Sequence, residues 1–261
     1  MQQTGFTHVD HQLSHGIDGK IGNRNSMALI NLAWNKDFMW DGGVNNLEMQ
    51  PINPITNPLE MDETIEHVIA KLQASEKYRI LFAKAFGDEK ITSQRLLKAL
   101  AQFTVMLTSS NAKYDKVMRK EESFTTQEQH GYDLFKINCA SCHKEPLFSD
   151  DRFEKNGLSI DETLNDFGIK ITNKPEDYLR FKTPTLRNIQ FTFPYMHDGR
   201  FKSLTEVIKH YNSLGHDKNL PKELDKPMNL SNNDRVDLVA FLVTLTDKDF
   251  LFNNRFSFPR E

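Results

Sequence analysis

Two cysteines and a histidine stand together in Asn138-Cys-Ala-Ser-Cys-His-Lys144, and these are the only two cysteines among the 261 residues. A disulfide between them would close a very small loop and would constrain the unfolded chain little. A thioredoxin-like redox pair needs a preceding strand and a βαβ setting, and a zinc site needs further ligands at fixed spacing; we find neither pattern. C-x-x-C-H is also the attachment motif of c-type haem. We therefore predict that Cys139 and Cys142 anchor a haem edge and that His143 is the axial ligand of its iron.

A helix is expected to deliver this motif. Residues 126–135 have helical apolar spacing and run directly into the cysteines, with Thr125 or Thr126 as the N-cap. A long loop rich in Pro, Gly, Asn and Asp follows, from Lys144 to about Ser203, and wrapping a cofactor is a suitable role for a loop of this length. Helices are predicted at about 204–212 and after the capping sequence Ser231-x-x-Asp234.

The first 60 residues are predicted to be irregular, because Gly, Asn and Pro occur throughout them. Helical periodicity begins after Asp62, and it predicts helices around 65–72, 80–87 and 96–107. Residues 109–113 have the composition of a linker. No strand alternation and no short repeat is evident, so the fold class is predicted to be mostly α.

Composition excludes several classes of protein. Hydrophobic residues make up 38% of the chain and charged residues 26%, with a net charge of −3. This balance is not that of a disordered chain, and it offers no basic field for nucleic acid. No apolar run approaches the ~20 residues that span a bilayer, so no transmembrane segment is expected. The N-terminus lacks the layout of a signal peptide.

Several motifs occur in an order that resembles the bacterial di-haem cytochrome c peroxidase and MauG family, and the resemblance covers nearly the whole chain. They are Arg24-Asn-Ser26, Phe38-Met-Trp-Asp-Gly42, Leu47-Glu-Met-Gln50, Asn57-Pro-Leu-Glu-Met61, Gly131 to His143, Phe181-Lys-Thr-Pro-Thr-Leu-Arg-Asn188, Thr192-Phe-Pro-Tyr-Met-His-Asp-Gly199 and Leu242-x-x-Leu245.

The resemblance implies two cytochrome c-like haem domains. Residues 1–115 would be the remainder of the N-terminal, peroxidatic domain, incomplete at its N-terminus, and residues 116–261 the C-terminal domain with covalent haem. Only the second attachment motif is present, so we expect one covalent haem here, two in the full protein, and a sequence that starts just after the first motif. A genuinely degenerate protein is the other interpretation of the missing motif.

The implied activity is that of a cytochrome c peroxidase-type oxidoreductase. Hydrogen peroxide would be reduced to water at the N-terminal haem, with electrons from a small cytochrome or cupredoxin entering through the C-terminal haem. A periplasmic location is expected, because C-x-x-C-H attachment occurs outside the cytoplasmic membrane, and a homodimer is typical of these peroxidases. A mono-haem electron carrier, or an inactive remnant, is the alternative if the chain is complete as it stands.

The resemblance assigns the peroxidatic pocket to Gln50, Pro54 and Glu60, which have the family spacing. A carboxylate over an open iron can take a proton from peroxide and return it to the leaving oxygen. The plain alternative is a polar loop of turn-forming residues. Trp40 matches a tryptophan that lies between the haems and assists electron transfer; the alternative is a core aromatic.

The sixth ligand of the C-terminal iron is assigned to Tyr211, fourteen residues after His197, where the peroxidases proper have Met. Tyr at this position resembles MauG and raises a second hypothesis, a MauG-like oxidase of a protein or organic substrate. Phenolate ligation would favour ferric iron and lower the reduction potential relative to His/Met ligation. Met196 is the rival ligand.

The resemblance also implies a Ca²⁺ ion held by Asn25, Thr192 and Pro194, whose oxygen donors suit that ion; such residues also occur in ordinary turns. His15 resembles a histidine that caps the peroxidatic iron in the resting enzyme, although solvated loop histidines are the simpler explanation for His8, His11 and His15. Arg187, His197 and Asp198 are expected to order haem propionates or to orient the loop.

Overall fold

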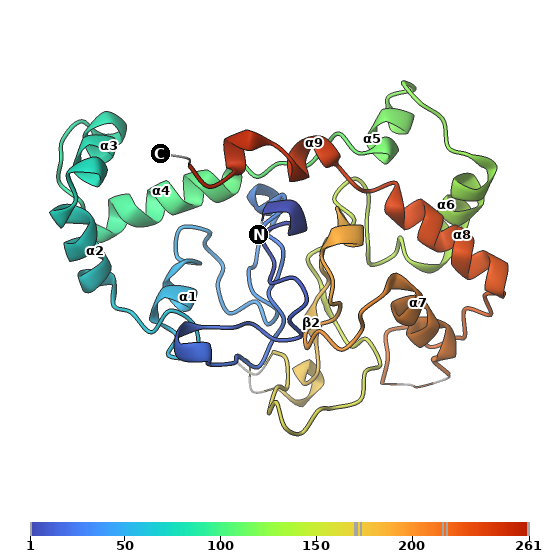
Figure 1. The fold of residues 1–261 in the computed structure, drawn as a ribbon. Coiled ribbons are helices and arrows are strands. Elements are labelled where there is room, and N and C mark those ends of the chain that lie inside the picture. Colours follow the sequence, from blue (N-terminus) through green and yellow to red (C-terminus); the bar gives the residue numbers. More distant parts are fainter. Residues whose placement is uncertain (1, 170–171, 173, 216, 218, 260–261) are drawn as a thin grey trace.

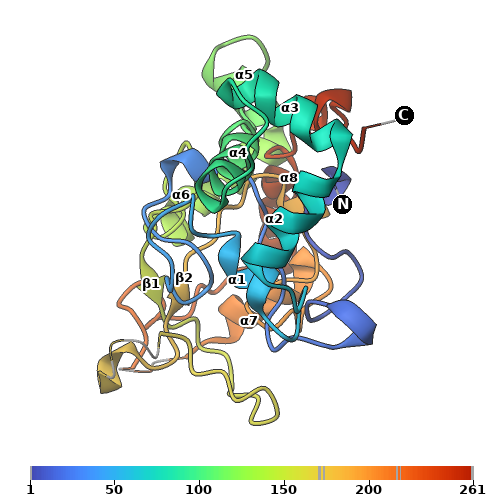
Figure 2. The ribbon, with the colours of Figure 1, turned by 90° about the vertical axis from the view of Figure 1, so that its left-hand side faces the viewer.

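Helices form the regular structure of the N-terminal half. The computed structural model describes residues 2–169, 172, 174–215, 217 and 219–259. The α-helices of this half are α1 (Ile52–Thr56), α2 (Ile65–Ala74), α3 (Glu76–Phe86) and α4 (Ser93–Val105). Figures 1 and 2 show α2, α3 and α4 gathered on one side of the molecule. The three helices predicted after Asp62 are thus confirmed, whereas the short α1 was not predicted.

Local signals account for the ends of these helices. The Thr64 side chain accepts a hydrogen bond from His67 N at the start of α2, and Thr92 accepts one from Arg95 N at the start of α4. Gly87 ends α3 with φ 91°, a left-handed conformation that costs glycine little. The helices are therefore bounded by residues that could be recognised in the sequence.

The C-terminal half is built on the packing of α6 (Thr126–Asn138) against α8 (Asn232–Val243), with α7 (Leu204–Ser213) beside them. Capping boxes start all three helices, at Thr125, Ser203 and Ser231. Gly131 permits the close approach of α6 to α8, because a Cβ there would lie 1.9 Å from the carbonyl oxygen of Asp237. The core of this half consists of Tyr114, Phe135, Phe148, Ile208, Leu230, Leu238, Phe241, Leu242 and Leu245.

Four features of the chain differ from the sequence-based expectation. The loop 144–203 contains a two-stranded antiparallel pair, β1 (Phe153–Glu154) and β2 (Phe181–Lys182). The short helices α5 (Lys113–Met118) and α9 (Lys248–Leu251) were not predicted. Leu245 lies beyond the end of α8. The 3-10 helices are η1 (Gln2–Thr4), η2 (Ile17–Gly19), η3 (Leu32–Trp34), η4 (Pro175–Asp177), η5 (Ile189–Phe191) and η6 (Asn254–Phe256).

The connection between the halves is a buried crossing rather than a loose linker. Ser109 is 1% exposed, and its hydroxyl donates to Oδ2 of Asp247, 3.1 Å away. The main-chain N–H groups of Ser110 and Asn111 donate to the same oxygen, each at 2.9 Å. Asp247 lies where the chain leaves α8 and returns to the first half. The two crossings are therefore bonded to each other.

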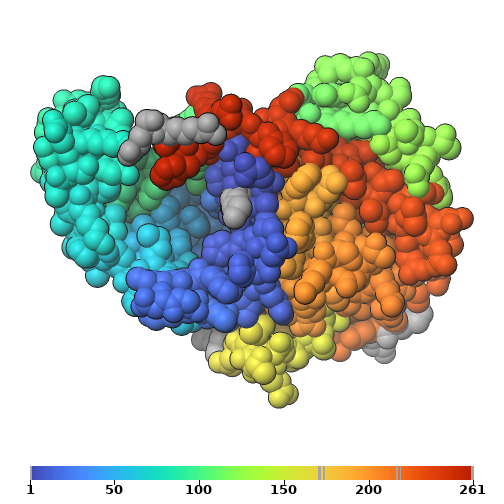
Figure 3. Space-filling model, in the orientation of Figure 1, coloured from blue at the N-terminus to red at the C-terminus, as the bar shows by residue number. Residues whose placement is uncertain are grey.

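The end of the chain belongs to the core of the N-terminal half. Phe250 and Leu251 of α9 pack in a cluster with Ile30 and Leu107, and Figure 1 shows the chain after α9 returning to the end of α4. In Figure 3 the N-terminal segment lies directly against the segment near residue 195. The two halves thus share a continuous interface. None of the described helices is long and apolar enough to span a membrane.

Candidate functional site: a cofactor cavity shared by both halves

One cavity of about 1300 Å³ lies between the halves and is lined by both. Ordinary ligand pockets occupy about 300–1,000 Å³, so this cavity has room for more than one bound group. Its C-terminal wall carries Cys139, Cys142 and His143, and its N-terminal wall carries Gln50, Pro54 and Glu60. Residues assigned from the sequence to two separate haem sites therefore face the same space.

The end of α6 brings the two thiols and the histidine together in a single turn. Cys139 is the C-cap of α6, and its carbonyl accepts hydrogen bonds from Cys142 N (3.2 Å) and His143 N (2.9 Å). Both cysteines are free thiols. Burial, and to a smaller extent the neighbouring Cys142, raises the pKa of Cys139 to about 12. The disulfide considered for this pair is not formed.

The imidazole of His143 is oriented by two main-chain carbonyls. Its Nδ1 lies 3.1 Å from the oxygen of Phe148 and 3.1 Å from that of Pro184. Because carbonyl oxygens only accept, Nδ1 must carry the proton, and Nε2 then has the lone pair. Burial lowers the pKa of His143 and so favours this neutral form. An imidazole held in this way is suited to bind a metal through Nε2.

Tyr211 and Met196 both line the cavity. Tyr211 lies in the last turn of α7, and burial, followed by the nearby Cys139 and Cys142, raises its pKa. The Met196 sulfur is 4.0 Å from Nδ2 of Asn156. The apolar part of this wall includes Leu186, Ile189, Leu204, Ile208, Leu238 and Leu242. Two thiols, an oriented imidazole, a second donor and apolar walls fit a c-type haem.

The predicted peroxidatic residues lie on the opposite wall. Nε2 of Gln50 is 3.8 Å from the sulfur of Met39, and Nδ2 of Asn57 donates to Oε1 of Glu60 at 3.2 Å. The carbonyl of Glu60 accepts from Ile17 N at 2.7 Å. The loop that carries Glu60 is thereby tied to the segment that follows His15.

His15 also lines the cavity. Its main-chain N–H donates to Nδ1 of His8 at 3.2 Å, and its ring centroid is 4.2 Å from that of His11. Among the described residues, no group of three or more His, Cys, Asp or Glu side chains is arranged to hold a metal ion. The three loop histidines therefore do not form a metal site by themselves.

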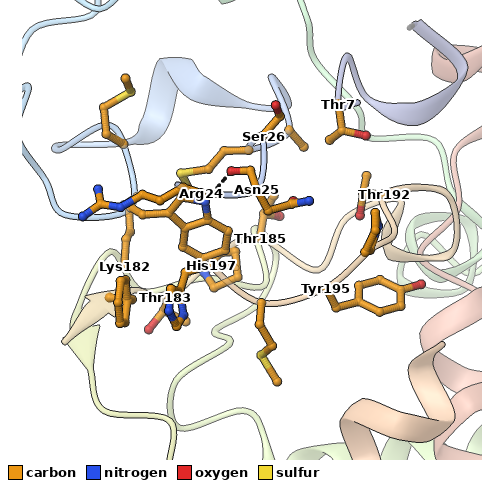
Figure 4. Close-up of a pocket in the computed structure, with 18 of the residues that line it drawn as sticks. Thr7, Arg24, Asn25, Ser26, Lys182, Thr183, Thr185, Thr192, Tyr195 and His197 are labelled. Carbon is orange, nitrogen blue, oxygen red and sulfur yellow. Dashed lines mark hydrogen bonds between the residues drawn. The ribbon is translucent and has the colours of Figure 1, made fainter. Parts of the chain in front are cut away.

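Trp40 and Asn25 both line the cavity and are bonded to each other. The Trp40 indole N–H donates to the carbonyl of Asn25 at 2.9 Å, drawn as a dashed line in Figure 4. The main-chain N–H of Asn25 donates to the carbonyl of His197 at 2.7 Å. Thr192 and Pro194 line the same cavity, and in Figure 4 the Asn25 side chain points toward Thr192. The three residues assigned to calcium therefore line the same cavity.

Arg187 lies apart from the described lining of the cavity. Its guanidinium donates to both carboxylate oxygens of Asp115, at 2.6 and 2.8 Å, and to the carbonyl of Pro146. Of its two expected roles, this arrangement favours orientation of the loop over contact with a propionate. Asp198 is buried and pairs with Arg200.

His197, by contrast, lines the cavity and stacks on Phe181, with centroids 3.6 Å apart and planes 13° apart. Its Nδ1 is buried and has no hydrogen-bond partner among the described residues. Because buried polar atoms are normally hydrogen-bonded, this nitrogen is suited to bond a polar group of a molecule bound in the cavity.

Sequence reasoning gave no role to two cationic residues of the cavity wall. Arg24 donates to both carboxylate oxygens of Asp166 and to Asp41, and Lys182 forms an ion pair with Asp151. Figure 4 shows Arg24 and Lys182 on the same wall as His197. Both residues lie inside motifs that carry the family resemblance. Only that position in a motif could have indicated from the sequence that they belong to the site.

A helix that ends in C-x-x-C-H, a histidine oriented by carbonyls and an apolar-walled cavity define a c-type haem protein. Residues 1–123 match the family model described as di-haem cytochrome c peroxidase, and residues 128–246 match that of cytochrome c.

Similar proteins agree with this assignment. A methylamine utilization protein MauG from Methylophilus methylotrophus is 37% identical over 85% of this chain and 68% of its own length. The cytochrome c551 peroxidase of Nitrosomonas europaea is 31% identical over 94% of this chain and 76% of its own. A crystal structure of a MauG-like protein associated with microbial copper homeostasis superposes with a TM-score of 0.88, at 28% identity, over 98% of this chain and 85% of that one. The chain therefore belongs to the di-haem cytochrome c peroxidase family, which includes MauG.

Proposed function

We propose that this protein is a di-haem c-type peroxidase that reduces hydrogen peroxide to water, using electrons from a small cytochrome or cupredoxin that enter through the C-terminal haem. The observation that supports this proposal is the shared cavity, whose lining includes both the C-x-x-C-H residues and Gln50, Pro54 and Glu60. Haem c supplies the redox-active iron. The roles below belong to the residues of this chain.

On the C-terminal wall, Cys139 and Cys142 would hold haem c through thioether links, and His143 would bind its iron through Nε2. Tyr211 would be the second protein ligand of that iron, with Met196 as the alternative. Phenolate is a hard anionic donor, so this choice lowers the reduction potential relative to methionine. Arg187 holds the loop through Asp115 and Pro146, and His197 stands at the edge of the site.

On the N-terminal wall, Glu60 is the acid–base group. Its carboxylate accepts a proton from bound peroxide and returns it to the leaving oxygen. The hydrogen bond from Asn57 to Oε1 holds one oxygen of this carboxylate in place. The Gln50 amide holds the peroxide by hydrogen bonding, Pro54 shapes the wall, and His15 is the group that caps the site at rest.

Trp40 lies between the two centres and assists electron transfer between them. Asn25, Thr192 and Pro194 hold a Ca²⁺ ion, and the hydrogen bond from Trp40 to Asn25 couples that ion to the indole. We take the domains as 1–115 and 116–261, a boundary that falls inside α5, with α9 of the second stretch packed in the core of the first. We also propose a periplasmic location, because haem attachment to C-x-x-C-H occurs there, and a homodimer as in related peroxidases.

A second candidate function is that of a MauG-like oxidase acting on a protein or organic substrate. The observation that favours it is Tyr211 on the cavity wall, where a peroxidase proper would present methionine. This candidate shares the haem sites and the peroxide pocket and differs in what is oxidised.

The experiment is to purify the holoprotein after export, count haem per chain from the pyridine haemochrome, and measure peroxide consumption with a reduced small cytochrome. Two haems and rapid cytochrome oxidation support the peroxidase. Two haems with slow cytochrome oxidation but a peroxide-dependent change in the optical spectrum support the oxidase. A single haem without peroxide consumption identifies an electron carrier. Calcium removal is expected to alter the optical spectrum; an unchanged spectrum and rate would remove the calcium role.

A further inference from the structure

The segment Phe181–Pro184 connects the two halves of the cavity wall. The main-chain N–H of Lys182 donates to the carbonyl of Trp40 at 2.8 Å. Two residues later, the carbonyl of Pro184 accepts from Nδ1 of His143 at 3.1 Å. Two hydrogen bonds and a short stretch of main chain therefore join the predicted iron ligand to the predicted intermediary of electron transfer. We call residues 181–184 the strap.

The strap is held along its whole length. Its first two residues form β2 and pair with β1, and the side chain of Lys182, 3% exposed, forms an ion pair with Asp151. The main-chain N–H of Thr183 donates to the carbonyl of Arg152 at 2.8 Å, and the hydroxyl of Ser149 donates to the carbonyl of Thr183 at 2.7 Å. These bonds leave the strap little freedom to move relative to the haem loop.

A closed circuit of contacts fixes the other side of the strap. Trp40 donates to the carbonyl of Asn25, and Asn25 donates to the carbonyl of His197. The His197 ring stacks on Phe181, and Phe181 is the first residue of the strap, which leads back to Trp40 through Lys182. Nδ1 of His197 has no partner among the described residues, and its Nε2 lies 4.0 Å from Oδ2 of Asp198. The stack on Phe181 is the contact that closes the circuit.

We propose that Phe181 is a positioning residue for electron transfer: its stack on His197 fixes the strap, and the strap fixes Trp40 and His143 relative to each other. This inference rests on the proposed function, from which it takes His143 as iron ligand and Trp40 as intermediary. One electron from the donor protein passes from the His143 side to the Trp40 side, and no bond in the chain forms or breaks. The electron path then depends on a side chain that is neither the predicted iron ligand nor the predicted intermediary.

The test is the variant Phe181→Leu in the holoprotein, which removes the flat ring while keeping an apolar side chain. We expect unchanged haem content, a shifted electron paramagnetic resonance spectrum of the His143-ligated iron as its imidazole turns, and an altered near-ultraviolet circular dichroism spectrum of Trp40. Electron equilibration after rapid partial reduction is expected to slow by about 10–100-fold, as small misplacements of reacting groups do. Phe181→Tyr keeps the ring face and is expected to restore all three readouts.

The matched control is Phe86→Leu, because Phe86 also stacks on an aromatic ring, that of Phe82 at 5.5 Å, but lies on α3. The inference is overturned if the spectra and the rate of Phe181→Leu equal those of the unaltered protein, or if Phe86→Leu changes them equally. Should Phe181→Leu fail to fold, Ser149→Ala removes one bond to the strap. A smaller change of the same kind supports the inference, and no change refutes it.

The two spectra report on His143 and Trp40 even in a protein that fails to consume peroxide. A wrong proposed function therefore appears as missing turnover in the unaltered protein, and a wrong positioning role appears as unchanged spectra in the variant.

Discussion

Nδ1 of His143 lies 3.1 Å from the carbonyl oxygen of Pro184, forty-one residues further along the chain. This contact, with the second one to Phe148, decides which nitrogen of the imidazole faces the cavity. Both acceptors are main-chain carbonyls, so the tautomer of this imidazole is set by the backbone of residues 148 and 184.

Tyr211→Met is expected to change the ligand of the C-terminal iron and to raise its reduction potential, because thioether sulfur stabilises ferrous iron better than phenolate does. The measurement is a redox titration followed optically, in which the methionine–iron charge-transfer band should appear in the variant. Met196→Leu is the control and should leave the spectrum unchanged. If the unaltered protein already shows that band, and Met196→Leu abolishes it, Met196 is the ligand.

Glu60→Gln is expected to reduce peroxide turnover by about 10²–10⁴-fold, the usual contribution of a positioned acid–base group, while haem content and the resting spectrum stay the same. Steady-state peroxide consumption with a reduced cytochrome measures it. Glu63→Gln is the matched control: Glu63 pairs with Lys71 and His67 and does not line the cavity. If peroxide turnover falls equally in Glu60→Gln and Glu63→Gln, Glu60 is not the acid–base group.

Asp247→Asn is expected to destabilise the protein by about 1–3 kcal/mol, since the amide cannot accept at both positions and buried N–H groups lose their acceptor. The carboxylate is 2% exposed and accepts from Ser109, Ser110, Asn111 and Phe250. Thermal unfolding should show a Tm lower by roughly 2–4 °C per kcal/mol. Asp249→Asn, two residues on and exposed, should change Tm little. A similar Tm for both variants would contradict this expectation.

His130 links α6 to α8 through Asp237, 2.8 Å away, and this hydrogen bond raises the pKa of His130 above its ordinary value. The pair therefore stabilises the fold fully below a pH of about 6.5, where the histidine is charged in both states, and this contribution is lost as the pH rises through the raised pKa.

His130→Gln should consequently lower the urea midpoint more at pH 6 than at pH 9. In an Asp237→Asn background the same substitution should have little further effect. Equal losses at both pH values would show that the ion pair does not contribute to stability.

Much of the helical fold could be predicted because its signals are local. The caps at Thr125 and Ser231 and the stop at Gly87 are each visible within a few residues, and the structure has helix ends at all three. The pair β1–β2 could not be predicted, because each strand has two residues and its partner lies in a distant part of the loop. The helices α5 and α9, of six and four residues, are also short and depend on packing rather than on periodicity.

The residues of the candidate site could be predicted only in part, because sequence signals are local and many of its contacts are not. The C-x-x-C-H turn is local, and the family spacing placed Gln50, Pro54 and Glu60 on a common wall. Nothing in the sequence indicated that Phe181 would stack on His197, or that Arg187 would pair with Asp115 instead of facing the cavity, because these contacts join residues 16 and 72 positions apart. Such pairings are decided by the tertiary fold.

The return of α9 to the N-terminal half has a consequence for how this protein can be divided. The chain passes between the halves twice, at residues 109–112 and again near Asp247, so the first half is assembled from both ends of the sequence. A graft that replaced one half would have to transplant two separate stretches, and a cut at one crossing would leave the other as a tether. For gene fusion, domain shuffling and engineering, the two halves are therefore one indivisible module.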